Sequence, residues 1–295
     1  MTLWRGVSVV YEDNHLLVTV KPPNMPTQAD ASGDPDLQSV MKAYIAERYQ
    51  KPGAVYLGLV HRLDRPVGGL VVLARTSKAA DRLSAQVREK TMARTYLAVV
   101  RGMALSEGRL RDWLLKDGQT NTVRVVPEGT AGAKEARLSF ERVAAREGLS
   151  LVRVRLETGR AHQIRVQLSH AGIPIWGDAR YGAGQPGQQI ALWGYKLTLE
   201  HPTTHEILTF HAMPEGGIWN LYADLLTVPE DTDTPREPGM IHLTPEVVET
   251  LENFNRRSAD QREPSESPSG KASSDREPLS EEEKEIAEKW KGSPE

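Results

Sequence analysis

The sequence contains no cysteine among its 295 residues, which excludes disulfide bonds, thiolate metal sites and cysteine nucleophiles. Aromatic residues make up only 6%, and no apolar run approaches the ~20 residues that a membrane-spanning helix needs. One of the longest apolar runs is 70–74. The N-terminus lacks the basic stretch and following apolar segment of a secretory signal. We therefore expect a cytoplasmic protein that does not associate with a membrane.

The net charge of −3 hides an uneven distribution. Residues 229–295 hold 18 acidic and 9 basic residues, whereas residues 1–228 hold 28 basic and 22 acidic residues. A mildly basic body favours a polyanionic partner. The tail is rich in Ser, Pro and charge, which predicts one domain at 1–228 and a largely disordered acidic extension with short helices at 229–295. Such an extension is either simply solvated or competes with the polyanion for the basic body.

The body is predicted to be rich in strands. Apolar patterning predicts two strands within 7–20 and further strands at 70–74, 96–100, 122–126, 136–143, 149–157, 190–199 and 207–211. Helical spacing predicts helices at 36–49 and 160–171, and another that Ser77 caps and that runs to about Lys90. In the acidic extension, helices are expected at 244–254 and after Ser280.

Residues 61–65 read His-Arg-Leu-Asp-Arg and precede Pro66, two glycines and an apolar strand. Asp64 lies between two arginines in the sequence, and nearby cations favour the ionised carboxylate. An ionised carboxylate can act as a nucleophile or as a base. The spacing alone leaves open a solvated ion-pair network in a surface loop.

A second cluster, at 157–165, reads Glu-Thr-Gly-Arg-Ala-His-Gln-Ile-Arg. It lies at a predicted strand-to-helix junction, where Gly159 permits a tight turn. Arg160 and Arg165 supply guanidinium groups that suit phosphates or a carboxylate. A helix N-terminus with solvated charges is the alternative.

Taken together, these clusters resemble the RluA-like pseudouridine synthases. The matching stretches run in order from about residue 8 to 219: 21–22, 61–65 with 69–70, 94–96 with 100–102, 158–166, 172–175 with 177–178 and 181–182, and 201–202 with Pro214. The resemblance does not extend to the N-terminal S4-type RNA-binding domain of many members, which we expect to be absent.

Three stretches depart from the family pattern. Residues 67–68 are Val-Gly where Thr-Ser is common, 23–24 are Pro-Asn after the Lys-Pro pair, and 192–194 are Leu-Trp-Gly in place of Leu-His-Ala. None of these departures removes a charged position of the motifs. They therefore bear on substrate fit more than on activity.

The resemblance implies an α+β fold, in which a mixed, mainly antiparallel sheet is flanked by helices and carries a central basic cleft. It also implies an enzyme that converts specific uridines of rRNA or tRNA to pseudouridine. In that reaction the N1–C1′ bond breaks, the uracil turns, and C5 bonds to C1′. No metal, nucleotide or redox cofactor is implied, and a monomer is expected.

By resemblance, Asp64 is the essential carboxylate, and whether it attacks the sugar or removes a sugar proton stays open. Tyr96 is expected to lie against the uracil and help take the C5 proton. Arg165 is expected to pair with Asp64 and hold it ionised.

Five further residues are candidates for substrate binding. Arg62 is expected to fill the space of an extruded base or to hold a phosphate, and Arg65 and Arg160 to contact RNA. His61 is either a structural hydrogen-bonding group or an acid–base group. Lys21 either positions phosphates or is merely exposed. RNA selection is expected to rest on the loops 22–36 and 103–134.

Two other functions remain as alternatives. The first is a catalytically inactive RNA-binding protein on the same fold. The second is a glycoside hydrolase in which Glu157 or Asp178 is a second carboxylate beside Asp64. His201 and His205 have a four-residue spacing, but Pro202 lies between them and no acidic ligand pattern surrounds them. We therefore expect no metal site.

Overall fold

The computed structural model describes residues 2–185 and 187–226. Its strands are β1 (Thr2–Trp4), β2 (Val7–Glu12), β3 (Leu16–Lys21), β4 (Gly58–Leu59), β5 (Gly68–Ala74), β6 (Ala93–Arg101), β7 (Glu107–Asp117), β8 (Thr122–Val126), β9 (Lys134–Arg146), β10 (Leu149–Leu156), β11 (Leu192–Glu200) and β12 (Ile207–His211). The helices are α1 (Leu37–Arg48), α2 (Ser77–Glu89) and α3 (Gln163–His170), with a 3₁₀ helix at Gly217–Tyr222.

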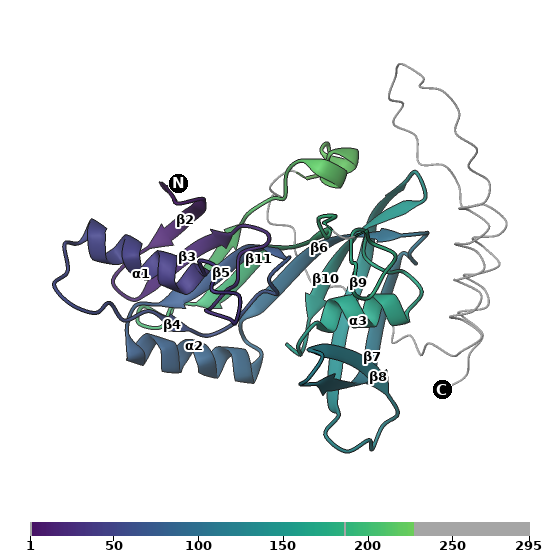
Figure 1. Ribbon diagram of the computed structural model, residues 1–295, viewed down its shortest axis with the longest axis horizontal. Helices are drawn as coiled ribbons and strands as arrows, with labels where there is room; N and C mark the ends of the chain where they lie inside the picture. Colours follow the sequence, from purple (N-terminus) through teal and green to yellow (C-terminus); the bar gives the residue numbers. More distant parts are fainter. Residues whose placement is uncertain (1, 186, 227–295) are drawn as a thin grey trace.

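All twelve strands belong to one sheet, in the order β1-β2-β3-β5-β11-β6-β10-β9-β7-β8, with β12 beside β11 and β4 beside β5. Every strand pairing is antiparallel except that of β5 with β11. Helices α1 and α2 accompany the half that contains β2, β3, β5 and β11, and α3 accompanies the half that contains β7 to β10 (Figure 1). The predicted α+β fold with a mainly antiparallel sheet is confirmed.

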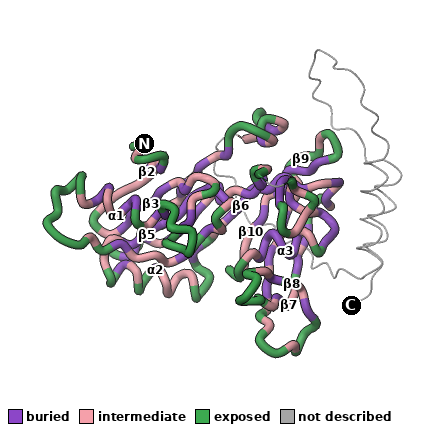
Figure 2. Tube along the Cα trace, viewed as in Figure 1, coloured by how far each residue is buried: buried purple, intermediate pink, exposed green. Residues whose placement is uncertain are grey.

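The apolar run of β5 is explained by cover on both faces of the sheet. Its side chains alternate between two apolar clusters: Val71 and Leu73 pack with α1, and Leu70, Val72 and Ala74 pack with α2. Every residue of β5 is buried, as are most residues of the central strands (Figure 2). A strand covered on both faces needs no polar side chains, which is why the run is continuous.

Residues 103–134, expected to act as a loop in RNA selection, hold two strands, of which the sequence predicted only the one at 122–126. These strands are β7 and β8, which form a hairpin, and β7 also pairs with β9. In β7 the buried apolar side chains are Leu110 and Leu114, and charged residues fill much of the rest. This sparse apolar pattern hides the period of two that marks a strand.

Helix α3 is shorter at its start than predicted. It begins at Gln163, because His162 has the left-handed backbone conformation, with a φ of 52°. Such a residue cannot continue a right-handed helix toward Arg160. Residues 160–162 therefore lie outside the helix, where they line the cleft.

The predicted acidic extension, 229–295, with its helices at 244–254 and after Ser280, lies outside the described residues. Within 2–185 and 187–226, no helix is both long enough and apolar enough to cross a membrane.

Thr76, rather than Ser77, caps helix α2. The Thr76 hydroxyl accepts a hydrogen bond of 3.1 Å from the backbone N–H of Ala79, and Ser77 is the first helical residue. We expect Thr76→Ala to lower the free energy of unfolding by about 1 kcal/mol. Ser77→Ala is the matched control and should change it by less than ~0.5 kcal/mol. Urea denaturation of both variants measures the difference, and equal effects would contradict this assignment.

Candidate active site

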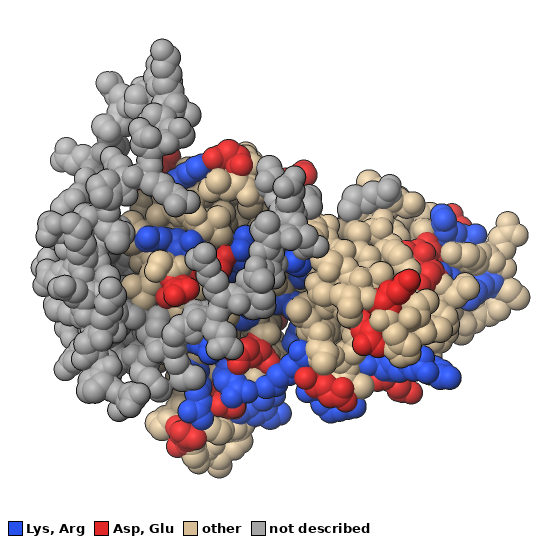
Figure 3. All heavy atoms as spheres, turned by 180° about the vertical axis from the view of Figure 1, so that it is seen from behind, with Lys and Arg blue, Asp and Glu red and all other residues tan. Residues whose placement is uncertain are grey.

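A cleft of about 1170 Å³ opens over β6, near the middle of the sheet. It is lined by segments far apart in the sequence: the loops 26–30 and 59–67, the end of α2, strand β6, the β7–β8 hairpin and residues 156–165. Basic residues in the lining outnumber acidic ones by nine to three. From behind, lysine and arginine gather along the lower side of the molecule, with acidic side chains among them (Figure 3).

Asp64 lies on the cleft-lining loop, which several hydrogen bonds hold in place. The hydroxyl of Thr27 donates to the carbonyl of Leu63 at 2.7 Å and accepts from its N–H at 3.3 Å. The backbone N–H of Val67 donates to the carbonyl of Asp64 at 2.9 Å, which closes a turn. The Asp64 side chain is 27% exposed, so its carboxylate is fixed in position yet open to a substrate.

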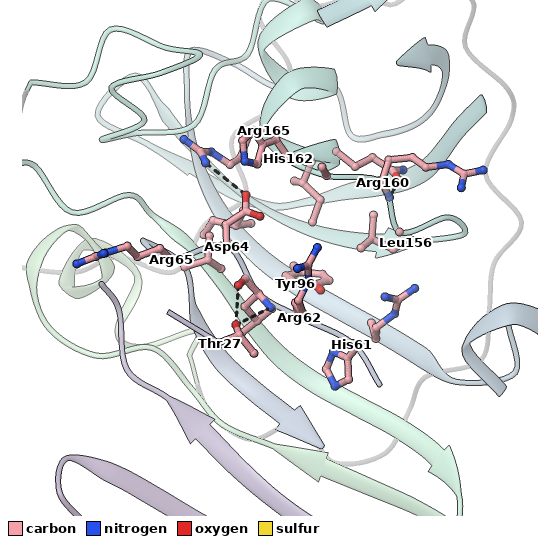
Figure 4. A pocket seen from close by; sticks show the side chains of 18 of the residues that line it. Thr27, His61, Arg62, Asp64, Arg65, Tyr96, Leu156, Arg160, His162 and Arg165 are labelled. Atoms are coloured by element: carbon pink, nitrogen blue, oxygen red, sulfur yellow. Dashed lines mark hydrogen bonds and ion pairs between the residues drawn. The ribbon is translucent and has the colours of Figure 1, made fainter. Parts of the chain in front are cut away.

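Arg165, in the first turn of α3, supplies the guanidinium beside Asp64. Its Nη1 lies 3.3 Å from Asp64 Oδ2 (Figure 4). Its Nε and Nη2 donate to the two carboxylate oxygens of Asp178 at 2.8 and 2.7 Å, and its guanidinium carbon lies 5.1 Å from the ring centre of Tyr181. Burial acts to lower the pKa of Arg165, but the bonds to Asp178 and Asp64 outweigh it and raise the pKa. This guanidinium is therefore charged and held from three sides.

Asp178 is the residue that sequence reasoning missed as the holder of Arg165. It is buried, and its Oδ1 also accepts from the backbone N–H groups of Arg180 and Tyr181 at 3.0 and 3.2 Å. Burial acts to raise the pKa of Asp178, yet these bonds lower it overall. A carboxylate that stays ionised with both oxygens engaged has no proton to give, which argues against Asp178 as the acid of a glycoside hydrolase.

Tyr96 lines the cleft from β6, opposite Gly194 of β11. Burial raises the pKa of its phenol, so the hydroxyl is protonated at neutral pH. Leu156, Ile164 and Leu192 line the same cleft. This apolar and aromatic surface suits a planar heterocyclic base.

Two of the predicted substrate-binding arginines are available to a ligand. Arg62 is exposed and makes no hydrogen bond or ion pair with the described residues, and it lies near Tyr96 (Figure 4). The exposed Arg160 donates from Nε to the carbonyl of Glu135 at 2.8 Å and keeps its terminal nitrogens for other partners.

Lys21 is neither exposed nor free to position phosphates, so both alternatives for it are wrong. It is fully buried, and its Nζ donates to the carbonyls of Pro22, Met25 and Arg65 at 2.9, 2.7 and 3.1 Å. Burial lowers its pKa to about 7. Lys21 therefore stabilises the loop of Asp64 through its backbone carbonyls instead of contacting a ligand.

Arg65 and His61 also differ from the predicted binding set. The guanidinium of Arg65 turns away from Asp64 (Figure 4), and it forms ion pairs with Asp34 and Asp30. The ion pair of Asp64 is therefore with Arg165 and not with Arg65, its neighbour in the sequence. His61 is buried and its Nε2 accepts from the backbone N–H of Val72 at 3.1 Å, which supports the structural alternative.

Comparison with known proteins agrees with this geometry. Residues 15–170 match the family model described as RNA pseudouridylate synthase. The chain belongs to the RNA pseudouridylate synthase family. The resemblance predicted from the motifs is confirmed, and the chain is an RNA-modifying isomerase.

Individual relatives match most of the chain. The uncharacterized RNA pseudouridine synthase YhcT of Bacillus subtilis is 35% identical over 220 residues, which cover 73% of this chain and 71% of that protein. The ribosomal large subunit pseudouridine synthase D of Pseudomonas aeruginosa is 34% identical over 233 residues, with the same coverage. The structure of human RNA pseudouridylate synthase domain containing 4 has a TM-score of 0.62 and 20% identity, and covers 76% of this chain and 95% of that one.

Two departures from the family motifs belong together in space. Gly68 of β5 and Trp193 of β11 are partners in the parallel register. A Cβ added at Gly68 would lie 2.1 Å from the Trp193 ring, and the indole Nε1 donates to the carbonyl of Ala212 at 2.8 Å. The tryptophan therefore requires a glycine at 68, so neither departure is independent of the other.

The two carboxylates around Arg165 should respond differently to substitution. We expect Asp178→Asn to lower the free energy of unfolding by about 3 kcal/mol, because it leaves a buried guanidinium without its bidentate partner. Asp64→Asn is the control, since its carboxylate is part-exposed and contacts Arg165 at 3.3 Å, and should cost less than ~1 kcal/mol. Chemical denaturation compares them, and an equal loss for both would contradict this account.

The pKa of His61 predicts a pH dependence of stability. Burial lowers this pKa from 6.5 to about 3, so the unfolded chain binds the extra proton between these values. The stability that neutral His61 contributes is present above pH 6.5 and is lost as the pH falls toward 3. From pH 7.5 to 5, the free energy of unfolding should drop by ~2 kcal/mol more in wild type than in His61→Gln. Parallel curves for the two proteins would show that His61 is not buried in the neutral form.

Proposed function

We propose that this enzyme converts uridine to pseudouridine in large-subunit ribosomal RNA, with Asp64 as its catalytic carboxylate. The observation that supports this most is the ion pair of Asp64 with Arg165 beside Tyr96 in a basic cleft. The relatives named as ribosomal large subunit pseudouridine synthases favour rRNA over tRNA as the substrate. We also propose that it acts as a monomer in the cytoplasm and without a cofactor.

The basic cleft fits an RNA strand with one base turned out of its stack. A carboxylate recessed in a cleft cannot reach C1′ of a uridine that stays stacked in a helix, so the nucleotide has to be extruded. Arg62 is placed to fill the vacated space or to hold a phosphate, because it has no partner among the described residues. Arg160 provides a further cation on the opposite side of the cleft (Figure 4).

The isomerisation conserves every atom of the uridine. The N1–C1′ bond breaks, the uracil turns, a bond forms between C5 and C1′, and the proton lost from C5 is balanced by one gained at N1. Asp64 acts either on C1′ as a nucleophile or on a sugar proton as a base, and in both cases Arg165 contacts its carboxylate at 3.3 Å. Geometry alone is compatible with each.

Tyr96 has two proposed roles that its environment supports unequally. Its buried ring offers a face for the uracil during the turn. Because the phenol is protonated, it can accept the C5 proton only if it passes its own proton on in the same step. The packing role is therefore the simpler one.

The deciding experiment is pseudouridine mapping of rRNA and tRNA from cells with wild-type protein, without the protein, and with Asp64→Asn. We expect one or a few rRNA sites to disappear in the second and third cases. With purified protein and a matching transcript, Asp64→Asn should be at least ~1000-fold slower while still binding RNA. Unchanged modification in cells without the protein, and binding without conversion in vitro, would instead favour the inactive RNA-binding alternative.

A further inference from the structure

Arg94 is a basic residue of the cleft lining that the proposed function does not use. It lies on β6 two residues before Tyr96, so both side chains project from the same face of the strand. Both line the cleft, whereas Thr95 between them does not. A group bound at Tyr96 therefore has the Arg94 guanidinium as a neighbour along the strand.

The guanidinium of Arg94 has no anionic partner. Among the described residues it makes no ion pair and no hydrogen bond, and its Nε is buried without an acceptor. Its cleft neighbours Arg65 and Arg165 are both paired with carboxylates. A partly buried cation that lacks a counter-charge is unfavourable in the free protein, and an anionic ligand would relieve that cost.

Gly159 provides the space in which this guanidinium lies. A Cβ added at Gly159 would meet Arg94 Nη1 at 3.0 Å and Nη2 at 3.2 Å. The φ of Gly159 is outside the left-handed region, so its backbone conformation does not itself require glycine. The absence of a side chain at Gly159 therefore leaves the room that the guanidinium of Arg94 occupies.

We propose that Arg94, seated against Gly159, binds a phosphodiester group of the substrate RNA next to the target uridine. The planar fork of a guanidinium matches two phosphate oxygens, and phosphates are the anions that RNA offers. This inference rests on the proposed function, because the cleft must hold RNA. A contact to a carbonyl of the uracil is the competing occupant, and the experiments below separate the two.

The first experiment measures RNA binding against salt concentration, with Asp64→Asn present in every protein so that the RNA stays unmodified. Arg94→Gln should weaken binding about 10-fold and reduce the slope of log K against log salt by about 1. Lys78→Gln removes the same charge from an exposed position outside the cleft lining and should change neither quantity. An unchanged slope for Arg94→Gln would overturn the proposal.

The second experiment identifies the phosphate. Each linkage flanking the target uridine is replaced in turn by a neutral methylphosphonate. In the protein with Arg94, one replacement should weaken binding about as much as Arg94→Gln does, and in Arg94→Gln that same replacement should have no further effect. If every replacement affects both proteins equally, Arg94 does not bind a phosphate, and a uracil contact takes its place.

Gly159→Ala gives an independent test, because the clash it creates is with the end of a flexible side chain and the fold should persist. We expect unchanged thermal unfolding. In the protein that keeps Asp64, KM should rise while kcat stays within about 2-fold. Combined with Arg94→Gln, Gly159→Ala should raise KM no further. Additive losses would contradict the seating of Arg94 against Gly159. Wild-type protein that binds no RNA would refute the proposed function itself, whereas normal wild-type conversion with an insensitive Arg94→Gln refutes this inference alone.

Discussion

The bidentate ion pair between Arg165 and Asp178 is the interaction on which the active site depends. Both partners are buried, and the carboxylate is further bonded by two backbone N–H groups. Because Asp178 occupies two of the guanidinium's nitrogens, the remaining one has a defined direction, and it points at Asp64. The orientation of the guanidinium beside Asp64 is thus set by its ion pair with a second, buried carboxylate.

A second layer of contacts fixes the other side of the site. Lys21 and Thr27 bind backbone atoms of the loop that carries Asp64, so the loop is held without using the charged side chains that line the cleft. Side chains such as Arg62 and Arg94 make no hydrogen bond or ion pair with the part of the chain that the structure describes. The site therefore separates groups that support the loop from groups that remain open to the substrate.

Sequence reasoning predicted the elements with a clear apolar period, such as α1 and β5, because those patterns are local. Resemblance to a family brought Asp64 and Arg165 together across 101 positions of the chain, which no local pattern could do. Asp178 escaped notice as a holder of Arg165, and Lys21 was misjudged, because burial of a charged group depends on tertiary contacts. Strand β7 was missed since its alternation is interrupted by charges.

The continuity of the sheet has a consequence for recognition. Strand β6 pairs with β11 on one side and β10 on the other, so the two walls of the cleft belong to one hydrogen-bonded sheet, with a single register shift between Gly194 and Lys196. Walls that belong to one sheet resist moving apart, so the width of the cleft is set before RNA binds. The RNA has to change its conformation to enter, and a loop or bulge with weak base stacking does so more easily than a regular duplex.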